Sequence, residues 1–156
     1  MAVGANTLAT QNFTTATNTY NVAVGYNAGV LITTGIRNNL FGAETGEALT
    51  QGGDNIAIGY QALTADTLGS RSVAIGNNAL DAQNFTTATD AYNVAVGYAA
   101  GGATTTGIRS TLLGGLAGIL MLLALPEPPL KLIRLVAPDG LLPLKLPLLL
   151  LRRRRH

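Results

Sequence analysis

Few side chains of this 156-residue sequence could take part in catalysis. The one histidine is the last residue, His156, the chain has no cysteine, and residues 1–118 contain no lysine. A histidine base, a thiolate nucleophile, a Cys or His metal site and a phosphate-binding lysine are therefore missing from most of the chain. No Gly-x-Ser-x-Gly motif occurs either. We predict a protein that is not an enzyme and that uses no cofactor and no metal.

Carboxylates are the remaining candidates for chemistry. Asp54 and Asp66 could face a ligand, and Asn and Asp ladders could hold calcium, although the Gly-Asp-rich nonapeptide of calcium-binding repeats is absent. A pair of acids about 5–9.5 Å apart across two subunits would suit glycoside hydrolysis. The residues to inspect for such a pair are Asp54, Asp66, Asp81 and Asp90. Because isolated acids are mostly solvated surface residues, we interpret these four first as surface residues.

Aromatic residues indicate where a ligand could bind. The segments 11–20 and 83–92 each contain an insertion relative to the repeat described below, and extra residues of this kind emerge as a loop on one face. The candidate surface-binding residues are Phe13, Tyr20, Phe85 and Tyr92. Alternatively, these rings cover the core beneath a longer turn. We expect Tyr26, Tyr60 and Tyr98, which follow glycines, to line a subunit interface or to pack at corners rather than to bind a ligand.

The charges divide the chain into two parts. Residues 1–118 have three arginines and six acids, a net charge of 3 − 6 = −3, whereas residues 119–156 have seven cations and two acids, a net charge of 7 − 2 = +5. Nucleic acid is therefore not an expected partner of the first part. The two parts are predicted to be a repeat domain (1–118) and a Leu/Pro/Arg-rich tail (119–156).

A repeat defines the elements that position these residues. An Asn/Ser-Val/Ile-Ala-Val/Ile-Gly pattern and its variants occur seven times, in shorter and longer units. Four units complete a longer period, because the segment that begins at Gln11 recurs from Gln83. The six later repeat glycines, which we expect to end strands and form turns, are Gly25, Gly42, Gly59, Gly76, Gly97 and Gly114. The apolar period of two predicts strands and argues against an amphipathic helix.

Short units of this kind bury their apolar faces by stacking, so the sequence predicts an all-β, parallel β-solenoid of seven coils. Within each strand we expect the large residues, such as Ile58, to fill the coil, and the alanines, such as Ala57, to face outwards. The Asn or Ser that begins each strand should form a ladder with its neighbours in the stack. Arg37, Asp54 and Arg71 should place an acid between two bases.

The strand motif followed by a small residue resembles the head repeats of trimeric autotransporter adhesins, which are also found in phage tail fibres and bacterial surface proteins. The resemblance covers residues 1–118 and implies a left-handed parallel β-roll, a homotrimer, and attachment to a host surface, a matrix molecule or a glycan. It places the protein at the cell surface or outer membrane, or in a virion tail fibre. The sequence lacks the family's signal peptide, neck and stalk, so we expect a segment of a longer fibre.

This resemblance leaves alternatives open for the function. The first is a phage fibre that binds or processes glycans. The second is a repeat protein anchored in a membrane. Ice binding through flat threonine rows is a weaker alternative, because the threonine pairs do not recur at one column of every coil.

The tail has three interpretations. Leucine supplies 15 of residues 119–156, and all six prolines lie there. The first interpretation is a membrane anchor, although prolines and charges interrupt its apolar stretch. The second is that the basic cluster of residues 152–155 contacts anionic lipid or nucleic acid. The third, which we favour, is translation in a shifted reading frame, because CTN and CCN codons read one nucleotide earlier encode Thr, Ala, Ser or Pro, the composition of the repeat. Such a tail would be disordered or partly helical and would have no function.

Overall fold

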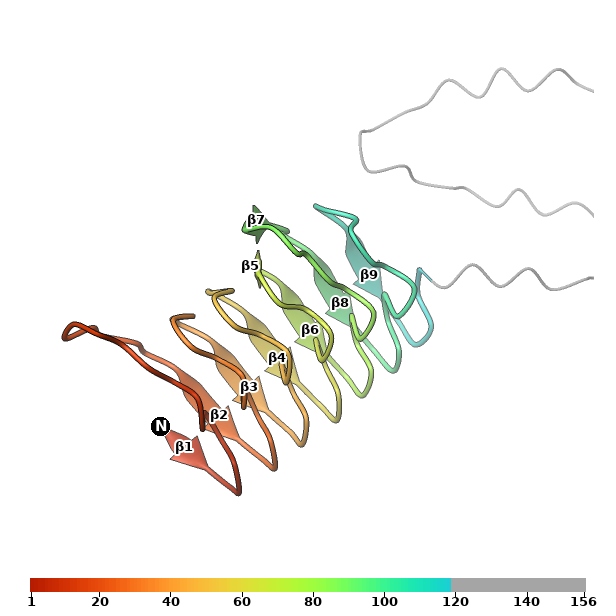
Figure 1. Cartoon of the computed structure of the whole chain (residues 1–156). Coiled ribbons are helices and arrows are strands. Elements are labelled where there is room, and N and C mark those ends of the chain that lie inside the picture. Colours follow the sequence, from red (N-terminus) through yellow and green to blue (C-terminus); the bar gives the residue numbers. More distant parts are fainter. Residues whose placement is uncertain (119–156) are drawn as a thin grey trace, which may run out of the picture.

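A computed structural model describes residues 1–118, which form a stack of about seven coils built from parallel strands (Figure 1). The predictions for the tail lie outside these described residues. Residues 1–118 contain strands and turns and no helix. The strands are β1 (Ala2–Val3), β2 (Val22–Val24), β3 (Asn39–Phe41), β4 (Ile56–Ile58), β5 (Gly69–Ser70), β6 (Val73–Ile75), β7 (Thr89–Asp90), β8 (Val94–Val96) and β9 (Thr111–Leu113).

The main sheet joins one strand from each coil. Its seven strands pair in parallel in the order β1-β2-β3-β4-β6-β8-β9. The central residues of successive strands are partners, for example Leu40 with Ala57 and Ala57 with Ala74. Strands β5 and β7 form a separate two-stranded pair. This register confirms the predicted solenoid, in which each repeat unit forms one coil.

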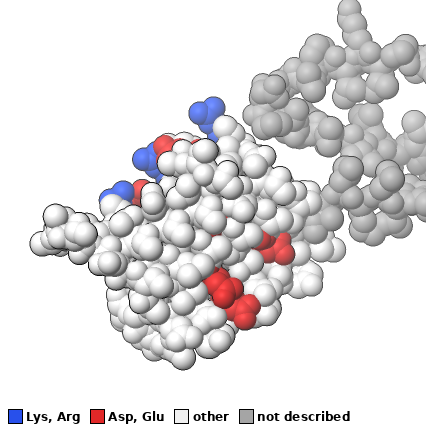
Figure 2. Space-filling model, viewed as in Figure 1, with Lys and Arg blue, Asp and Glu red and all other residues white. Residues whose placement is uncertain are grey.

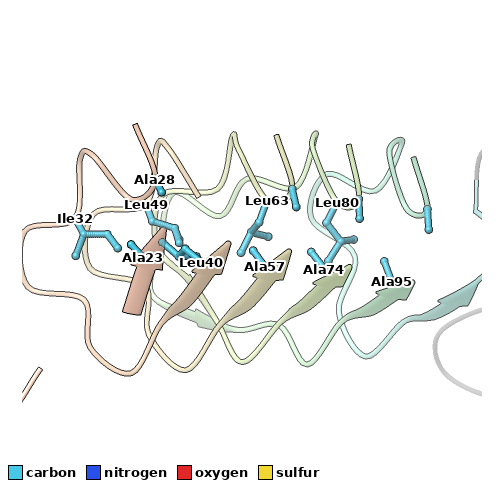
Figure 3. Packing of buried hydrophobic residues seen from close by; sticks show 13 residues of the cluster. Ala23, Ala28, Ile32, Leu40, Leu49, Ala57, Leu63, Ala74, Leu80 and Ala95 are labelled. Carbon is cyan, nitrogen blue, oxygen red and sulfur yellow. The ribbon is translucent and has the colours of Figure 1, made fainter. Parts of the chain in front are cut away.

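The two faces of each strand are the reverse of those we expected. Ala57 and Ala74 are fully buried, whereas Phe41 and Ile58 are each 40% exposed. Each coil is narrow, and its interior also receives large side chains from the opposite wall, including Leu49, Leu63 and Leu80 (Figure 3). Alanine fits the space that these leucines leave, so the larger strand residues point outwards.

Side-chain size is matched between strands and turns. The strand residue Leu40 is fully buried where its neighbours have alanine. Two turns that face Leu40 carry glycine, Gly29 and Gly46, at the position of the repeat that holds Leu63 in the following coil. A Cβ atom added to Gly29 would lie 2.8 Å from Leu40 Cδ1, and one added to Gly46 would lie 3.1 Å from Leu40 Cδ2. The leucine therefore occupies volume that the two glycines leave empty, as close packing requires.

The repeat glycines have the role predicted for them. Gly25, Gly42, Gly59, Gly76, Gly97 and Gly114 all have φ between +112° and +139°. A Cβ atom on Gly25 would lie 2.4 Å from the carbonyl oxygen of Gly42 in the next coil, and one on Gly42 would lie 2.5 Å from that of Gly59. Both the backbone conformation and the close approach of successive coils thus require glycine.

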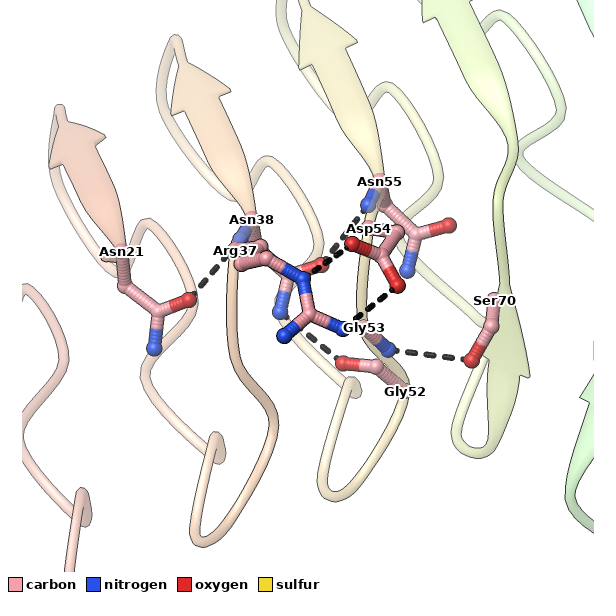
Figure 4. A network of polar contacts seen from close by, with 8 residues as sticks. All are labelled: Asn21, Arg37, Asn38, Gly52, Gly53, Asp54, Asn55 and Ser70. Carbon is pink, nitrogen blue, oxygen red and sulfur yellow. Dashed lines mark hydrogen bonds and ion pairs between the residues drawn. The ribbon is translucent and has the colours of Figure 1, made fainter. Parts of the chain in front are cut away.

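The predicted polar ladder is present and lies inside the fold (Figure 4). Asn21 Oδ1 accepts from the Asn38 N–H at 2.9 Å, and Asn38 Oδ1 accepts from the Asn55 N–H at 3.1 Å. Asn38 Nδ2 donates to the carbonyl oxygen of Gly52 at 2.9 Å. These side chains bond to the backbone of the next coil rather than to one another, and so satisfy buried main-chain groups where the strand begins.

Candidate functional site

A row of outward-facing side chains, here named the corner ridge, lies directly before the asparagine ladder. Its members occupy the same position in successive coils and share a left-handed backbone with φ between +51° and +62°. They are Tyr20, Arg37, Asp54, Arg71, Tyr92 and Arg109. At this corner the chain turns into the strand, and the side chain of each of these residues projects away from the core.

Ion pairs order the middle of the corner ridge. Arg37 Nε lies 2.5 Å and Arg37 Nη2 lies 2.9 Å from the two oxygens of Asp54 (Figure 4). The hydrogen bond from Arg37 lowers the pKa of Asp54 below its ordinary value. Arg71 pairs with Asp90 and donates to Tyr92 Oη at 2.8 Å. The expected acid between two bases is therefore only half formed, because Arg71 forms its ion pair with the following coil.

Cations of residues 1–118 collect on this corner. Figure 2 shows blue arginine atoms along one edge with acidic atoms beside them, and separate acidic patches elsewhere on the same view. Arg109 occupies the position of Arg37 one four-coil period later, and within residues 1–118 it has no ion pair. The guanidinium of Arg71 lies 5.5 Å from the centroid of the Tyr92 ring, a cation–π contact.

The two insertions differ in what they expose. Tyr20 is 68% exposed and Tyr92 is also exposed, both on the corner ridge, while Phe13 is partly buried. Phe85 is only 6% exposed, so its prediction as a surface-binding residue is wrong. Its ring is buried, and its carbonyl oxygen accepts from the Leu68 N–H at 3.0 Å.

Beneath the second insertion lies a buried polar network that sequence reasoning missed. Asp66, Ser72, Gln83 and Asn93 are all fully buried. Gln83 Nε2 donates to Asp66 Oδ2 at 2.6 Å and to Ser72 Oγ at 3.1 Å, while Gln83 Oε1 accepts from Asn93 Nδ2 at 2.7 Å. Two backbone N–H groups, those of Gly69 and Phe85, donate to Asp66 Oδ1. Asp66 therefore does not face a ligand, and it organises the turn instead.

The first insertion lacks this network. Gln11 occupies the position of Gln83 one period earlier, and its Nε2 is buried without a hydrogen-bond partner among residues 1–118. Asp66 and Gln83 occupy the same column of successive coils, and this column holds Gln11 and Thr104 as well as apolar Ile32 and Leu49. The residue types of the column therefore did not indicate that Asp66 and Gln83 are buried together.

A second exposed row, here named the tyrosine row, follows the repeat glycines at the far end of the strands. Tyr26, Tyr60 and Tyr98 are between 46% and 63% exposed, so none of them packs into the core of its own chain. Main-chain hydrogen bonds hold the intervening coils in register, for instance from the Glu44 N–H to the Tyr26 carbonyl oxygen at 2.8 Å. The Glu44 carboxylate raises the pKa of Tyr60, chiefly by charge repulsion with the phenolate.

Comparison with protein-family models, with curated proteins and with solved structures gives no match for this chain. The resemblance to adhesin head repeats therefore stays a prediction. Residues 1–118 contain no cluster of three or more acids that could hold a metal ion, and among them no helix is long and apolar enough to cross a membrane.

Proposed function

We propose that this chain is a non-catalytic segment of an attachment fibre, in a cell-surface adhesin or a phage tail fibre, that assembles with two copies of itself and contacts a host surface, a matrix molecule or a glycan. The observation that carries the proposal is the apolar outer face of the seven-stranded sheet. The residues at the end of its strands form an outward row: Val3, Val24, Phe41, Ile58, Ile75, Val96 and Leu113.

This row supports self-association. A large contiguous apolar patch on a soluble protein usually marks an interaction surface, and here the row runs the length of the stack. Since the partner must match a long, regular face, a second copy of the same stack is a fitting occupant. Copies related by rotation about an axis parallel to the stack would all point the same way along it, as in a closed cyclic assembly.

The fold also suits a fibre that holds ligands at fixed positions. Successive coils are bonded through their strands and turns, and where the ladder position holds asparagine its side chain adds a further bond to the next coil. Such a stack presents the corner ridge at regular intervals of about 4.8 Å per coil. Weak contacts repeated along the stack and around three subunits would combine through effective concentration.

A pair of charge substitutions tests the assembly. The full chain should sediment as a trimer, and Ile58→Lys should shift it to monomer by placing a charge on the sheet face while the β-sheet circular dichroism signal persists. Gln51→Lys adds the same charge at an exposed position outside the strands and should leave the trimer intact. A monomeric parent chain, or dissociation by both variants, would contradict the proposal.

A further inference from the structure

The tyrosine row has a regular period along the stack. Tyr26 and Tyr60 are separated by one coil that carries Ala43 in the same column, and Tyr60 and Tyr98 by one coil that carries Asn77. Two coils rise by about 9.6 Å, so the three rings repeat at that interval along the solenoid axis. A single ligand that contacts all three must itself be extended and periodic.

Hydrogen-bonding side chains run beside the rings. Gln61 Nε2 donates to Glu44 Oε2 at 2.8 Å, and Asn78 Nδ2 donates to Gln61 Oε1 at 3.2 Å. Asn27, one coil before Glu44, donates from its Nδ2 to Glu47 Oε1 at 3.2 Å. The side-chain amides can donate and accept further hydrogen bonds, and the carboxylates can accept them. This band of polar side chains beside the tyrosine row can therefore form hydrogen bonds with hydroxyl groups of a ligand.

The charge of this band restricts the ligand. Glu44 and Glu47 flank the tyrosine row, whereas all three arginines of residues 1–118 belong to the corner ridge, before the strands rather than after them. A sulfated or phosphorylated polymer would meet like charge here without a cation to pair with it. An uncharged polymer rich in hydroxyl groups meets no such cost.

We propose that the tyrosine row binds an extended, uncharged, β-linked polysaccharide that runs parallel to the fibre axis. Alternate sugars of such a chain turn the same face to one side, so every second sugar can lie against one of the three aromatic rings, Tyr26, Tyr60 and Tyr98. The C–H groups of a sugar face pack on the electron-rich face of an aromatic ring, and its hydroxyls bond to the flanking amides and carboxylates. This proposal rests on the proposed attachment function and names its ligand.

The contribution of each ring can be bounded. One aromatic stacking contact changes an equilibrium constant by up to about tenfold. The three stacking contacts lie on one rigid stack, so once the first sugar is bound the second and third contacts form within the same complex. Affinity should therefore rise steeply with ligand length. A disaccharide can engage one ring and a hexasaccharide three.

Titration calorimetry of the full chain with β-1,4-linked oligomers of glucose and of N-acetylglucosamine tests the proposal. At least one hexamer should bind, and the matching dimer should bind at least tenfold more weakly. Tyr60→Ala should weaken hexamer binding about tenfold. Ile108→Ala removes an exposed apolar side chain that belongs to neither exposed row, and it should leave binding unchanged. Circular dichroism and sedimentation of both variants should match the parent chain, because both side chains are exposed.

Three results would overturn the proposal: no binding of either hexamer, equal losses in the two variants, or failure of Tyr60 to react with a tyrosine-nitrating reagent in the assembled protein. The last result would show that subunit contacts cover the row. Because assembly is measured separately by sedimentation, a trimer that binds no oligomer would refute the glycan proposal and leave the fibre proposal intact.

Discussion

Gln83 and Gln11 provide an internal test of what the buried network contributes to stability. They occupy the same column of the four-coil period, yet Gln83 Nε2 donates to the buried Asp66 carboxylate and Gln11 Nε2 has no partner among residues 1–118. A hydrogen bond to a charged group contributes about 1.5–3 kcal/mol, and a buried carboxylate oxygen that loses its partner costs more. We therefore expect Gln83→Ala to lower the free energy of unfolding by about 3 kcal/mol, and Gln11→Ala by less than about 1 kcal/mol.

Urea unfolding of the full chain, followed by circular dichroism, measures both variants. Protein concentration must be held constant, because association with other copies adds to the apparent stability. The reasoning fails if the two substitutions cost the same, since the network would then contribute nothing beyond the packing of a glutamine side chain.

A change of charge at the same site adds a pH dependence. Gln83→Glu would place a second carboxylate 2.6 Å from Asp66 Oδ2 if it keeps the position of the amide. Two adjacent buried carboxylates raise the pKa of one of them, so the folded state would bind a proton more tightly than the unfolded state. The variant should therefore gain stability relative to the parent chain as the pH falls towards the raised folded pKa. A stability difference that is independent of pH would contradict this account.

Three further predictions concern the ladder, the core and the corner ridge. Asn38→Ala leaves two buried backbone groups without partners and should cost about 2–6 kcal/mol in urea unfolding, whereas Asn38→Ser, the residue type found in other coils of this column, should cost less. Leu40→Ala should cost about 2–5 kcal/mol, and the additional loss caused by Gly46→Ala should be smaller in the Leu40→Ala background than in the parent chain, as a double-mutant cycle would show. Pairing with Arg37 lowers the pKa of Asp54 below its ordinary value of 3.8, so the ion pair stabilises the folded state above that pH. This stabilisation should be lost as the pH falls through the folded-state pKa of Asp54. Asp54→Asn should remove this part of the pH dependence of the unfolding free energy.

Much of this architecture could be predicted from the sequence because the repeat is also the structural unit. The spacing of the copies determines which residues pair across strands, so the register, the glycine corners and the asparagine ladder all follow from alignment of the copies. Alternation shows that Ala57 and Ile58 lie on opposite faces of the strand, but it does not show which face is inside. That choice depends on the width of the coil and on the leucines that enter from the opposite wall, such as Leu63.

Other features depend on contacts between coils that alignment alone does not show. The roles of Asp66 and Gln83 become visible only when the second insertion folds over the preceding turn and buries both side chains. Similarly, the sequence places Phe85 and Tyr92 in one insertion, and only the fold shows that the first ring is buried and the second exposed.

The match between Leu40 and its neighbouring glycines limits how such a fibre can change in length. Loss of the single coil formed by residues 43–59 would bring the Leu40 side chain against Leu63, and both would compete for one space. Loss or gain of a whole four-coil period would keep every buried strand leucine next to turns that carry glycine. Recombination between repeats in the underlying gene should therefore be tolerated in steps of four coils and selected against in steps of one.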